Sequence, residues 1–189
     1  YSPRAAAASL AVVLALAGLT ATLRVRAAAP PDYQGACSAG EPWFATACYY
    51  GLTRSDKPGM TYEPRAASVV LFADTPNDGP HRVAATIEQV GTVWGLAYRS
   101  REQALFAAAY HKVQLPFSPA GPGAVYRIDL ETGQVRPFLT VPNVGPDRHE
   151  RTIRFDSAAE SWTSRAGLGD LDLSPDEAEL VVTNQEDRR

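Results

Sequence analysis

The sequence predicts an all-β fold, on three observations: apolar runs of strand length, the turn residues between them, and an internal repeat. Glycine and proline are frequent, with 14 and 15 among 189 residues, and they separate the short apolar runs. The composition is otherwise globular, with 45% hydrophobic and 21% charged residues. The chain can therefore bury a core built from many short strands.

The apolar runs follow one another from residue 43 onward. The first spans 43–50, and the next two, 67–73 and 82–87, flank a turn at 75–80 whose proline, asparagine and glycine favour chain reversal. Four further runs lie at 93–98, 104–110, 124–130 and 135–141. The last two alternate around the glycine turn 131–134, which predicts a hairpin. Four sequential strands predict one four-stranded sheet, the size of a propeller blade.

An internal repeat gives the strongest indication of architecture. Shifted by 75 residues, the segment 95–108 lies over 170–183 without a gap. Apolar residues coincide at four strand positions, pairing Leu96 with Leu171, Tyr98 with Leu173, Leu105 with Leu180 and Phe106 with Val181. A second unit is therefore predicted to begin near Leu168. The period exceeds that of a typical blade, and we attribute the excess to a polar inserted loop at 142–165.

Short motifs then suggest a family. Val182-Thr183-Asn184 matches the last three letters of the YVTN signature, although Val181 replaces its tyrosine. The segment 125–133 looks like the strand and turn that usually follow, and 174–177 like the polar turn between first and second strands. Residues 66–189 thus resemble YVTN/NHL-like β-propellers, and the propeller-like N-terminal region of bacterial adhesin-type surface proteins. The resemblance implies a partial β-propeller, with one full four-stranded blade and parts of its neighbours, and no catalytic chemistry.

The amino-terminal segment predicts export. Arg4 precedes an uncharged run at 5–23, and small residues follow it, which is the order of a signal peptide with cleavage near Ala27 or Ala28. The alternative is an uncleaved anchor, since 19 uncharged residues approach the ~20 that span a bilayer. We assign 1–29 to this signal helix or anchor and 30–65 to an irregular lead-in. Either case predicts a secreted or cell-surface protein that meets a membrane only through residues 5–23.

The two cysteines, Cys37 and Cys48, form an even pair in a chain expected to be exported. This predicts a disulfide, which would contribute roughly 2–3 kcal/mol by closing a short loop. Two buried free thiols are the alternative.

Candidate site residues are few. Asp170 and Asp172 flank Leu171, so on a strand they share one face and could bind a cation or take part in acid/base chemistry. Alternatively they line a central channel and accept backbone hydrogen bonds. The histidines, His81, His111 and His149, are far apart and show no ligand spacing. The segment 147–150 could donate oxygen and nitrogen to a metal through Asp147 and His149, but a solvated charged loop explains it better, so no metal or cofactor is expected. Tryptophans at 43, 94 and 162 could stack on sugars, although aromatic core residues are more common.

Two functions from different classes fit these observations. With 18 basic and 21 acidic side chains and no basic stripe, nucleic acid is not an expected partner. Nucleophile-elbow, P-loop and dinucleotide motifs are absent, so no catalytic residue is assigned. We therefore expect a fragment of a non-enzymatic extracellular propeller that presents loops to a protein or glycan. The alternative is a secreted propeller enzyme, either a lactonase-like hydrolase or a quinoprotein-like dehydrogenase.

Overall fold

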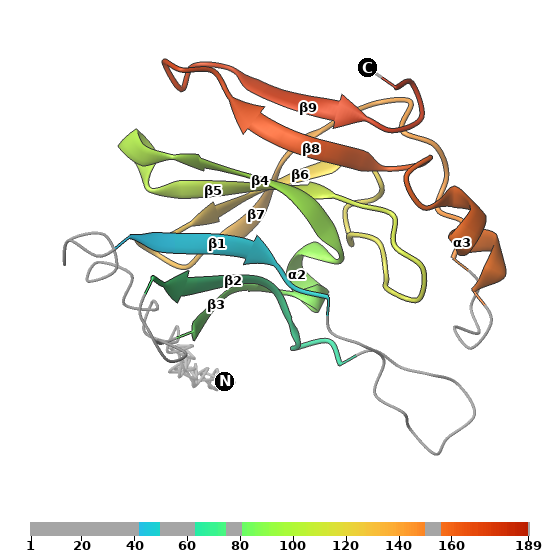
Figure 1. Ribbon diagram of the computed structural model, residues 1–189, viewed down its shortest axis with the longest axis horizontal. Coiled ribbons are helices and arrows are strands. Elements are labelled where there is room, and N and C mark those ends of the chain that lie inside the picture. The colour runs from blue at the N-terminus through green and yellow to red at the C-terminus, as the bar shows by residue number, and fades with distance from the viewer. Residues whose placement is uncertain (1–41, 50–62, 75–80, 150–155, 189) are drawn as a thin grey trace, which may run out of the picture.

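The computed structural model describes residues 42–49, 63–74, 81–149 and 156–188, and it confirms a mostly β chain. Its described strands form three antiparallel sheets, which Figure 1 shows as layers one above another. The strands are β1 (Trp43–Ala47), β2 (Ala67–Ala73), β3 (His81–Thr86), β4 (Val93–Arg99), β5 (Ala104–Ala109), β6 (Ala124–Asp129), β7 (Val135–Thr140), β8 (Leu168–Leu173) and β9 (Leu180–Asn184). The predicted signal segment, 1–29, lies outside the described residues.

The first sheet has the strand order β1-β2-β3. Ala45 in β1 lies opposite Leu71 in β2, so the segment expected to be an irregular lead-in contributes a paired strand. β2 and β3 pair antiparallel, as the turn residues between them predicted. β3 ends at Thr86, one residue earlier than expected, because the short helix α2 (Ile87–Val90) begins there. The Thr86 N–H donates to Gln89 Oε1 at 2.9 Å and helps to fix that helix start.

The middle sheet, β4-β5-β6-β7, is the predicted four-stranded antiparallel unit. Its last hairpin turns through Gly133, which has a φ of +70° and donates its N–H to the Asp129 carbonyl at 2.8 Å. A positive φ is easiest for glycine, so the turn sequence and the hairpin agree. Pro137 lies in β7, the outermost strand of this sheet, where a missing N–H is tolerated.

The third sheet, β8 and β9, repeats β4 and β5 at a distance of 75 residues. The corresponding cross-strand pairs are Leu96–Ala107 with Leu171–Val182, and Val93–Ala109 with Leu168–Asn184. Both hairpins also shift register between those two pairs. The similarity found in the sequence is therefore a structural repeat, down to the position of the irregularity in each ladder.

The interior of the middle sheet, above all β5, is covered on both faces, whereas its outer strand β7 is mostly exposed. All six residues of β5 are buried. Leu105 and Ala107 belong to the core shared with the first sheet, whereas Phe106 and Ala108 belong to the core shared with the third. Successive side chains point to opposite faces of a strand, so a strand covered twice becomes continuously apolar. This explains the uninterrupted run ALFAAA.

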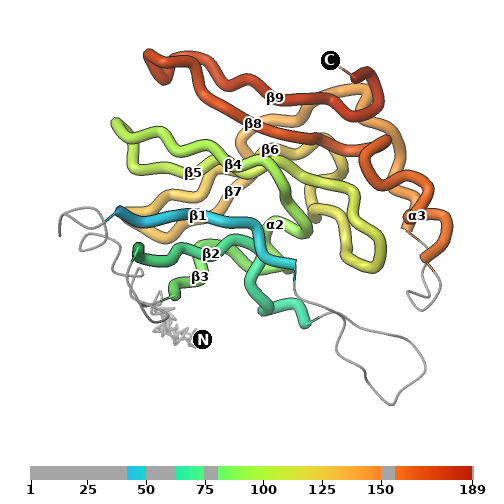
Figure 2. The backbone as a smooth tube through the Cα atoms, in the orientation of Figure 1, coloured from blue at the N-terminus to red at the C-terminus, as the bar shows by residue number. Residues whose placement is uncertain are grey.

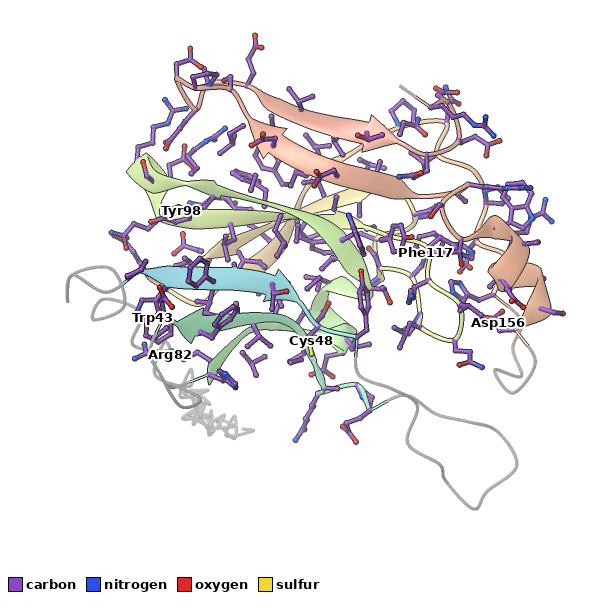
Figure 3. The ribbon with its side chains drawn as sticks, viewed as in Figure 1. Trp43, Cys48, Arg82, Tyr98, Phe117 and Asp156 are labelled. Carbon is purple, nitrogen blue, oxygen red and sulfur yellow. The ribbon has the colours of Figure 1, made fainter. Side chains whose placement is uncertain are left out.

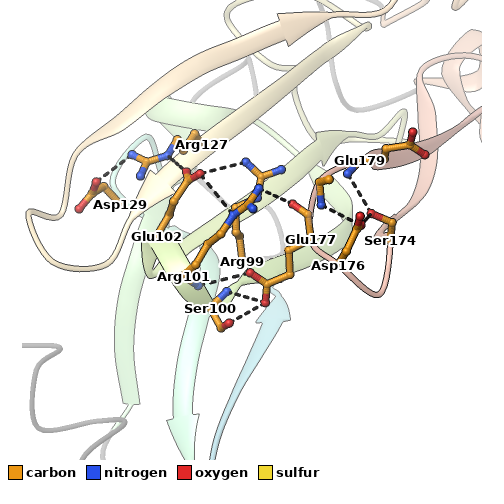
Figure 4. A network of polar contacts seen from close by, with 11 residues as sticks. Arg99, Ser100, Arg101, Glu102, Arg127, Asp129, Ser174, Asp176, Glu177 and Glu179 are labelled. Atoms are coloured by element: carbon orange, nitrogen blue, oxygen red, sulfur yellow. Dashed lines mark hydrogen bonds and ion pairs between the residues drawn. The ribbon is translucent and has the colours of Figure 1, made fainter.

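Polar contacts join the turns of the two repeated hairpins (Figure 4). Glu177 Oε1 accepts hydrogen bonds from the Ser100 N–H at 3.1 Å and the Ser100 hydroxyl at 2.6 Å. The Glu177 carbonyl accepts a hydrogen bond from the Arg101 guanidinium at 2.8 Å. Within the middle sheet, Glu102 pairs with Arg127 at 3.6 Å. The contacts to Glu177 are exposed, so their role is to align the two sheets more than to add stability.

The described part of the expected inserted loop, 142–149 and 156–165, includes regular structure. It contains the helix α3 (Ser157–Trp162), which lies beside the connection from β5 to β6 (Figure 2). The Gln114 N–H donates to Asp156 Oδ2 at 2.8 Å across this contact, and Ala159 is fully buried. The expected loop is thus packed against the sheet core at this point.

Two further expectations concern the exported state. Within the described ranges, no helix combines the length and the apolar character needed to cross a bilayer. Cys48 follows β1 and is half-buried, while Cys37 lies outside the described residues. Their disulfide therefore stays a prediction.

Candidate functional site

Asp170 and Asp172 both lie on the exposed side of β8, as strand alternation predicted. Each uses its Oδ1 atom to accept the N–H of the next residue, Leu171 at 2.9 Å and Leu173 at 2.7 Å. Such backbone hydrogen bonds are what a structural role of the two aspartates predicts. Asp170 additionally lines a pocket on the same side of the sheets.

This pocket opens where the first strands of the three sheets come together. Strands β1 and β4 contact each other, as do β4 and β8. The pocket has a volume of about 370 Å³, within the range of small-molecule sites. Its lining residues are Ala45, Thr46, Ala47, Tyr49, Trp94, Leu96 and Asp170. The side of the pocket formed by β1, β4 and Tyr49 is therefore mainly apolar and aromatic, whereas β8 contributes the acidic Asp170.

Trp94 is exposed yet held in place. The residue is 53% exposed to solvent, yet its ring stacks on that of Tyr49, with 6.3 Å between centroids, and contacts the tilted ring of Tyr110 at 5.5 Å. The Tyr49 hydroxyl donates to the Val93 carbonyl at 3.1 Å, and Lys112 Nζ lies 5.2 Å from the Tyr49 ring. Burial, with a contribution from Tyr110, raises the pKa of Tyr49, so its hydroxyl stays a donor. Trp94 thus presents a fixed indole face.

The other two tryptophans are less available. Trp43 on β1 is half-buried and carries the Arg82 guanidinium 4.9 Å from its ring. Trp162 at the end of α3 pairs in the same way with Arg148, also at 4.9 Å. Trp94 is therefore the tryptophan best placed to meet a ligand.

A second group of side chains gathers beside α3. His111 follows β5, Asp147 and His149 belong to the segment after β7, and Asp156 directly precedes α3. Figure 3 places Phe117 and Asp156 on this side of the molecule. Parts of the chain before β6 and after β7 therefore contribute to one cluster, which we call the His–Asp cluster (His111, Asp147, His149 and Asp156).

The two imidazole rings of the His–Asp cluster lie face to face, with 4.4 Å between centroids and 17° between planes. His149 Nδ1 lies 2.6 Å from Asp147 Oδ1, and His149 Nε2 lies 2.9 Å from the Lys112 carbonyl oxygen. His149 Nε2 also lies 3.9 Å from Asp156 Oδ2. The Asp156 carboxylate is nearly fully buried, with 1% of its side chain exposed.

His111 is the most unusual member of the cluster. It is fully buried, and neither of its ring nitrogens has a hydrogen-bond partner in the described part of the chain. The Phe117 ring packs edge-on against it at 4.8 Å. Burial, reinforced by His149, lowers the pKa of His111 to about 4, so the ring is neutral near pH 7. A buried polar group without a partner typically costs about 1–3 kcal/mol.

The donor atoms of the cluster are close enough to share a ligand. One atom each from His111, Asp147 and His149 lie within 4.8 Å of one another. Sequence reasoning proposed no metal, because 38 residues and two strands separate the histidines. The available signal was the Asp147-x-His149 spacing within an unusually long loop. His81 is not a member: it lies on β3 with its ring 6.2 Å from that of Phe72.

No family model matches the chain, and neither a curated protein nor a solved structure matches it. Inference about function therefore depends on the geometry of these side chains and on the sequence itself.

Proposed function

We propose that this chain is a segment of an exported, non-enzymatic, β-propeller-like protein that binds glycans in the pocket beside Trp94. One observation carries the proposal: a fixed and exposed indole lines a pocket at the meeting point of the first strands of three stacked sheets. In a propeller these strands surround the central channel. A pocket there is a natural place for a ligand.

The propeller-like arrangement has its own support. The middle sheet has four strands in sequential order, and its neighbours cover both faces of its interior, above all of β5. The next sheet begins with a hairpin that repeats the register of β4 and β5. Sheets that repeat along the chain and stack face to face are typical of propeller blades.

The pocket lining suits a sugar better than a flat protein surface would. The apolar face of a sugar ring stacks well on an indole such as that of Trp94. The Asp170 carboxylate and the Thr46 hydroxyl supply acceptors for sugar hydroxyl groups. A volume of about 370 Å³ fits a ligand of the size of a mono- or disaccharide. The mixed aromatic and polar lining therefore favours a glycan.

The enzymatic alternative, a lactonase-like hydrolase or a quinoprotein-like dehydrogenase, would depend on Asp170 and Asp172. Both already accept a backbone N–H, which is the arrangement expected of structural aspartates. The equivalent positions in the first repeat are Gly95 and Ala97, which offer no carboxylate. A binding role needs neither a nucleophile nor a paired acid and base, and so it fits these residues better.

Glycan binding can be tested with the purified full chain on a glycan array, followed by calorimetry with the tightest-binding sugar. Trp94→Ala removes the stacking surface and should weaken binding by about tenfold or more, because stacking on an aromatic ring is worth on the order of 1–3 kcal/mol. Phe44→Ala is the matched control, since Phe44 is similarly exposed, at 47%, but stacks on Phe72 and does not line the pocket.

The glycan proposal fails if no sugar binds, or if both variants weaken binding equally. Binding of a protein through Trp94 instead would also contradict it, while keeping the pocket as the site. Export is tested separately by fusing residues 1–29 to an alkaline phosphatase that lacks its own signal. Activity in the bacterial periplasm is expected, and an inactive cytoplasmic fusion would contradict export.

A further inference from the structure

We propose that His111, Asp147 and His149 bind a divalent transition-metal ion, with Zn²⁺ as the best fit. This site is distinct from the glycan pocket and does not depend on the function proposed above. Two imidazoles and one carboxylate make an N₂O donor set. Imidazole and carboxylate are common ligands of Zn²⁺, and three protein ligands with a water molecule would complete its preferred tetrahedral coordination.

The hydrogen bonds of His149 indicate which of its nitrogens faces the ion. A carbonyl oxygen can only accept, so the 2.9 Å contact with the Lys112 carbonyl requires a proton on His149 Nε2. In the neutral ring, Nδ1 then carries a lone pair and faces Asp147 Oδ1, another acceptor, at 2.6 Å. Two acceptors so close repel unless a cation or a proton lies between them. Donation of the second ring N–H to a backbone carbonyl is also how proteins orient metal-binding histidines.

His111 supplies an independent argument. Its ring is fully buried, and both nitrogens lack a partner in the described part of the structure. A buried imidazole whose ring nitrogens have no other partner offers a lone pair that can ligate a metal ion. A histidine that served only to fill the core would usually have at least one hydrogen bond.

Binding requires a small rearrangement. The three nearest donor atoms lie up to 4.8 Å apart, whereas ligands around Zn²⁺ lie about 3.4 Å apart for bonds of about 2.0–2.1 Å. Imidazole lone pairs also lie in the plane of the ring, so two nearly parallel rings cannot both point at one ion. One ring must therefore tilt, and metal binding should break the stack between His111 and His149.

The test uses the full chain, stripped of metal with EDTA and then titrated with Zn²⁺ in competition with a chromophoric chelator. We expect one Zn²⁺ per chain and a melting temperature that rises with Zn²⁺ concentration, because the ion binds the folded state. Co²⁺ replacing Zn²⁺ should give the visible absorption of a four-coordinate ion. His111→Phe, which keeps an aromatic ring beside Phe117, should remove that absorption and weaken Zn²⁺ binding at least tenfold.

A second variant keeps the test valid if His111→Phe does not fold. Asp147→Asn retains an oxygen to accept the His149 backbone N–H but removes the charge, and it should also weaken Zn²⁺ binding at least tenfold. His81→Phe is the control and should bind Zn²⁺ like the wild type. The proposal is overturned if the wild type takes up no stoichiometric Zn²⁺, or if every folded cluster variant binds Zn²⁺ as tightly as the wild type.

Discussion

Replacing Gly95 with alanine tests how closely the two repeated hairpins are packed. A Cβ atom at this position would lie 2.5 Å from the Leu171 nitrogen, 2.7 Å from the Gly169 oxygen and 2.8 Å from the Asp170 carbonyl carbon. All three atoms are backbone atoms of β8. None of them can rotate away, so relief of the overlap requires β4 and β8 to separate.

The expected cost follows from that separation. Normal contacts at a Cβ begin near 3.4 Å, so the strands must move apart by roughly 0.5–1 Å. A gap of this size forfeits about a quarter to a half of the dispersion energy across the contact. Overpacking of this kind typically destabilises a protein by about 1–3 kcal/mol. At about 2–4 °C per kcal/mol for a chain of this size, the melting temperature should fall by roughly 2–12 °C.

Thermal and urea denaturation of the full chain would measure this change. Gly169→Ala in β8 is the matched control, because its Cβ would meet the amide end of the Gln185 side chain, which can move aside. Gly169→Ala should therefore change the unfolding free energy by clearly less than Gly95→Ala. A Gly95→Ala protein as stable as the wild type, within about 0.5 kcal/mol, would refute the close packing of β4 on β8.

Two further predictions concern the middle sheet. The buried Tyr126 hydroxyl lies 2.5 Å from Ser118 Oγ and accepts the Ala120 N–H at 3.0 Å. Tyr126→Phe should therefore lower the free energy of unfolding, measured by urea denaturation, by about 1–3 kcal/mol. An unchanged urea midpoint would contradict this role of the hydroxyl. Burial disfavours the charged form of Asp129, but hydrogen bonds from the Thr132 N–H and from Arg127 outweigh burial and lower the pKa of Asp129. A lowered pKa in the folded state stabilises the fold above the unfolded value near 4, and this stabilisation is lost as pH falls through the folded value. Asp129→Asn should therefore lower the free energy of unfolding by about 1 kcal/mol at pH 6 and by progressively less below pH 4. A difference in stability between variant and wild type that stays constant down to pH 2 would exclude this mechanism.

The strands and hairpins were predictable because their signals are local. The glycine turn at 131–134 defined the hairpin of β6 and β7, and the residues at 75–80 defined that of β2 and β3. The repeat was predictable too, since Leu96 and Leu171 occupy the same position in their ladders. Local propensity and periodic spacing are sufficient for features of this kind.

The His–Asp cluster was not predictable for a physical reason. His111 and His149 meet because β6, β7 and the following segment return the chain to the end of β5, which no local pattern encodes. The burial of His111 likewise depends on Phe117 and on the packing of the inserted loop. The aromatic contacts of Trp94 were not predictable for the same reason, because its neighbours Tyr49 and Tyr110 come from other parts of the chain.

The 75-residue repeat has a consequence for how such a chain can diverge. The paired hairpins β4–β5 and β8–β9 keep their register although the segment between β7 and β8 is long. That segment supplies Asp147, His149 and Asp156, none of which takes part in the ladders. Mutations and insertions there can change the chemistry of one repeat while the stacking of the sheets is preserved. In a chain of this design, a new binding site can arise in one loop at a time while the sheets remain folded.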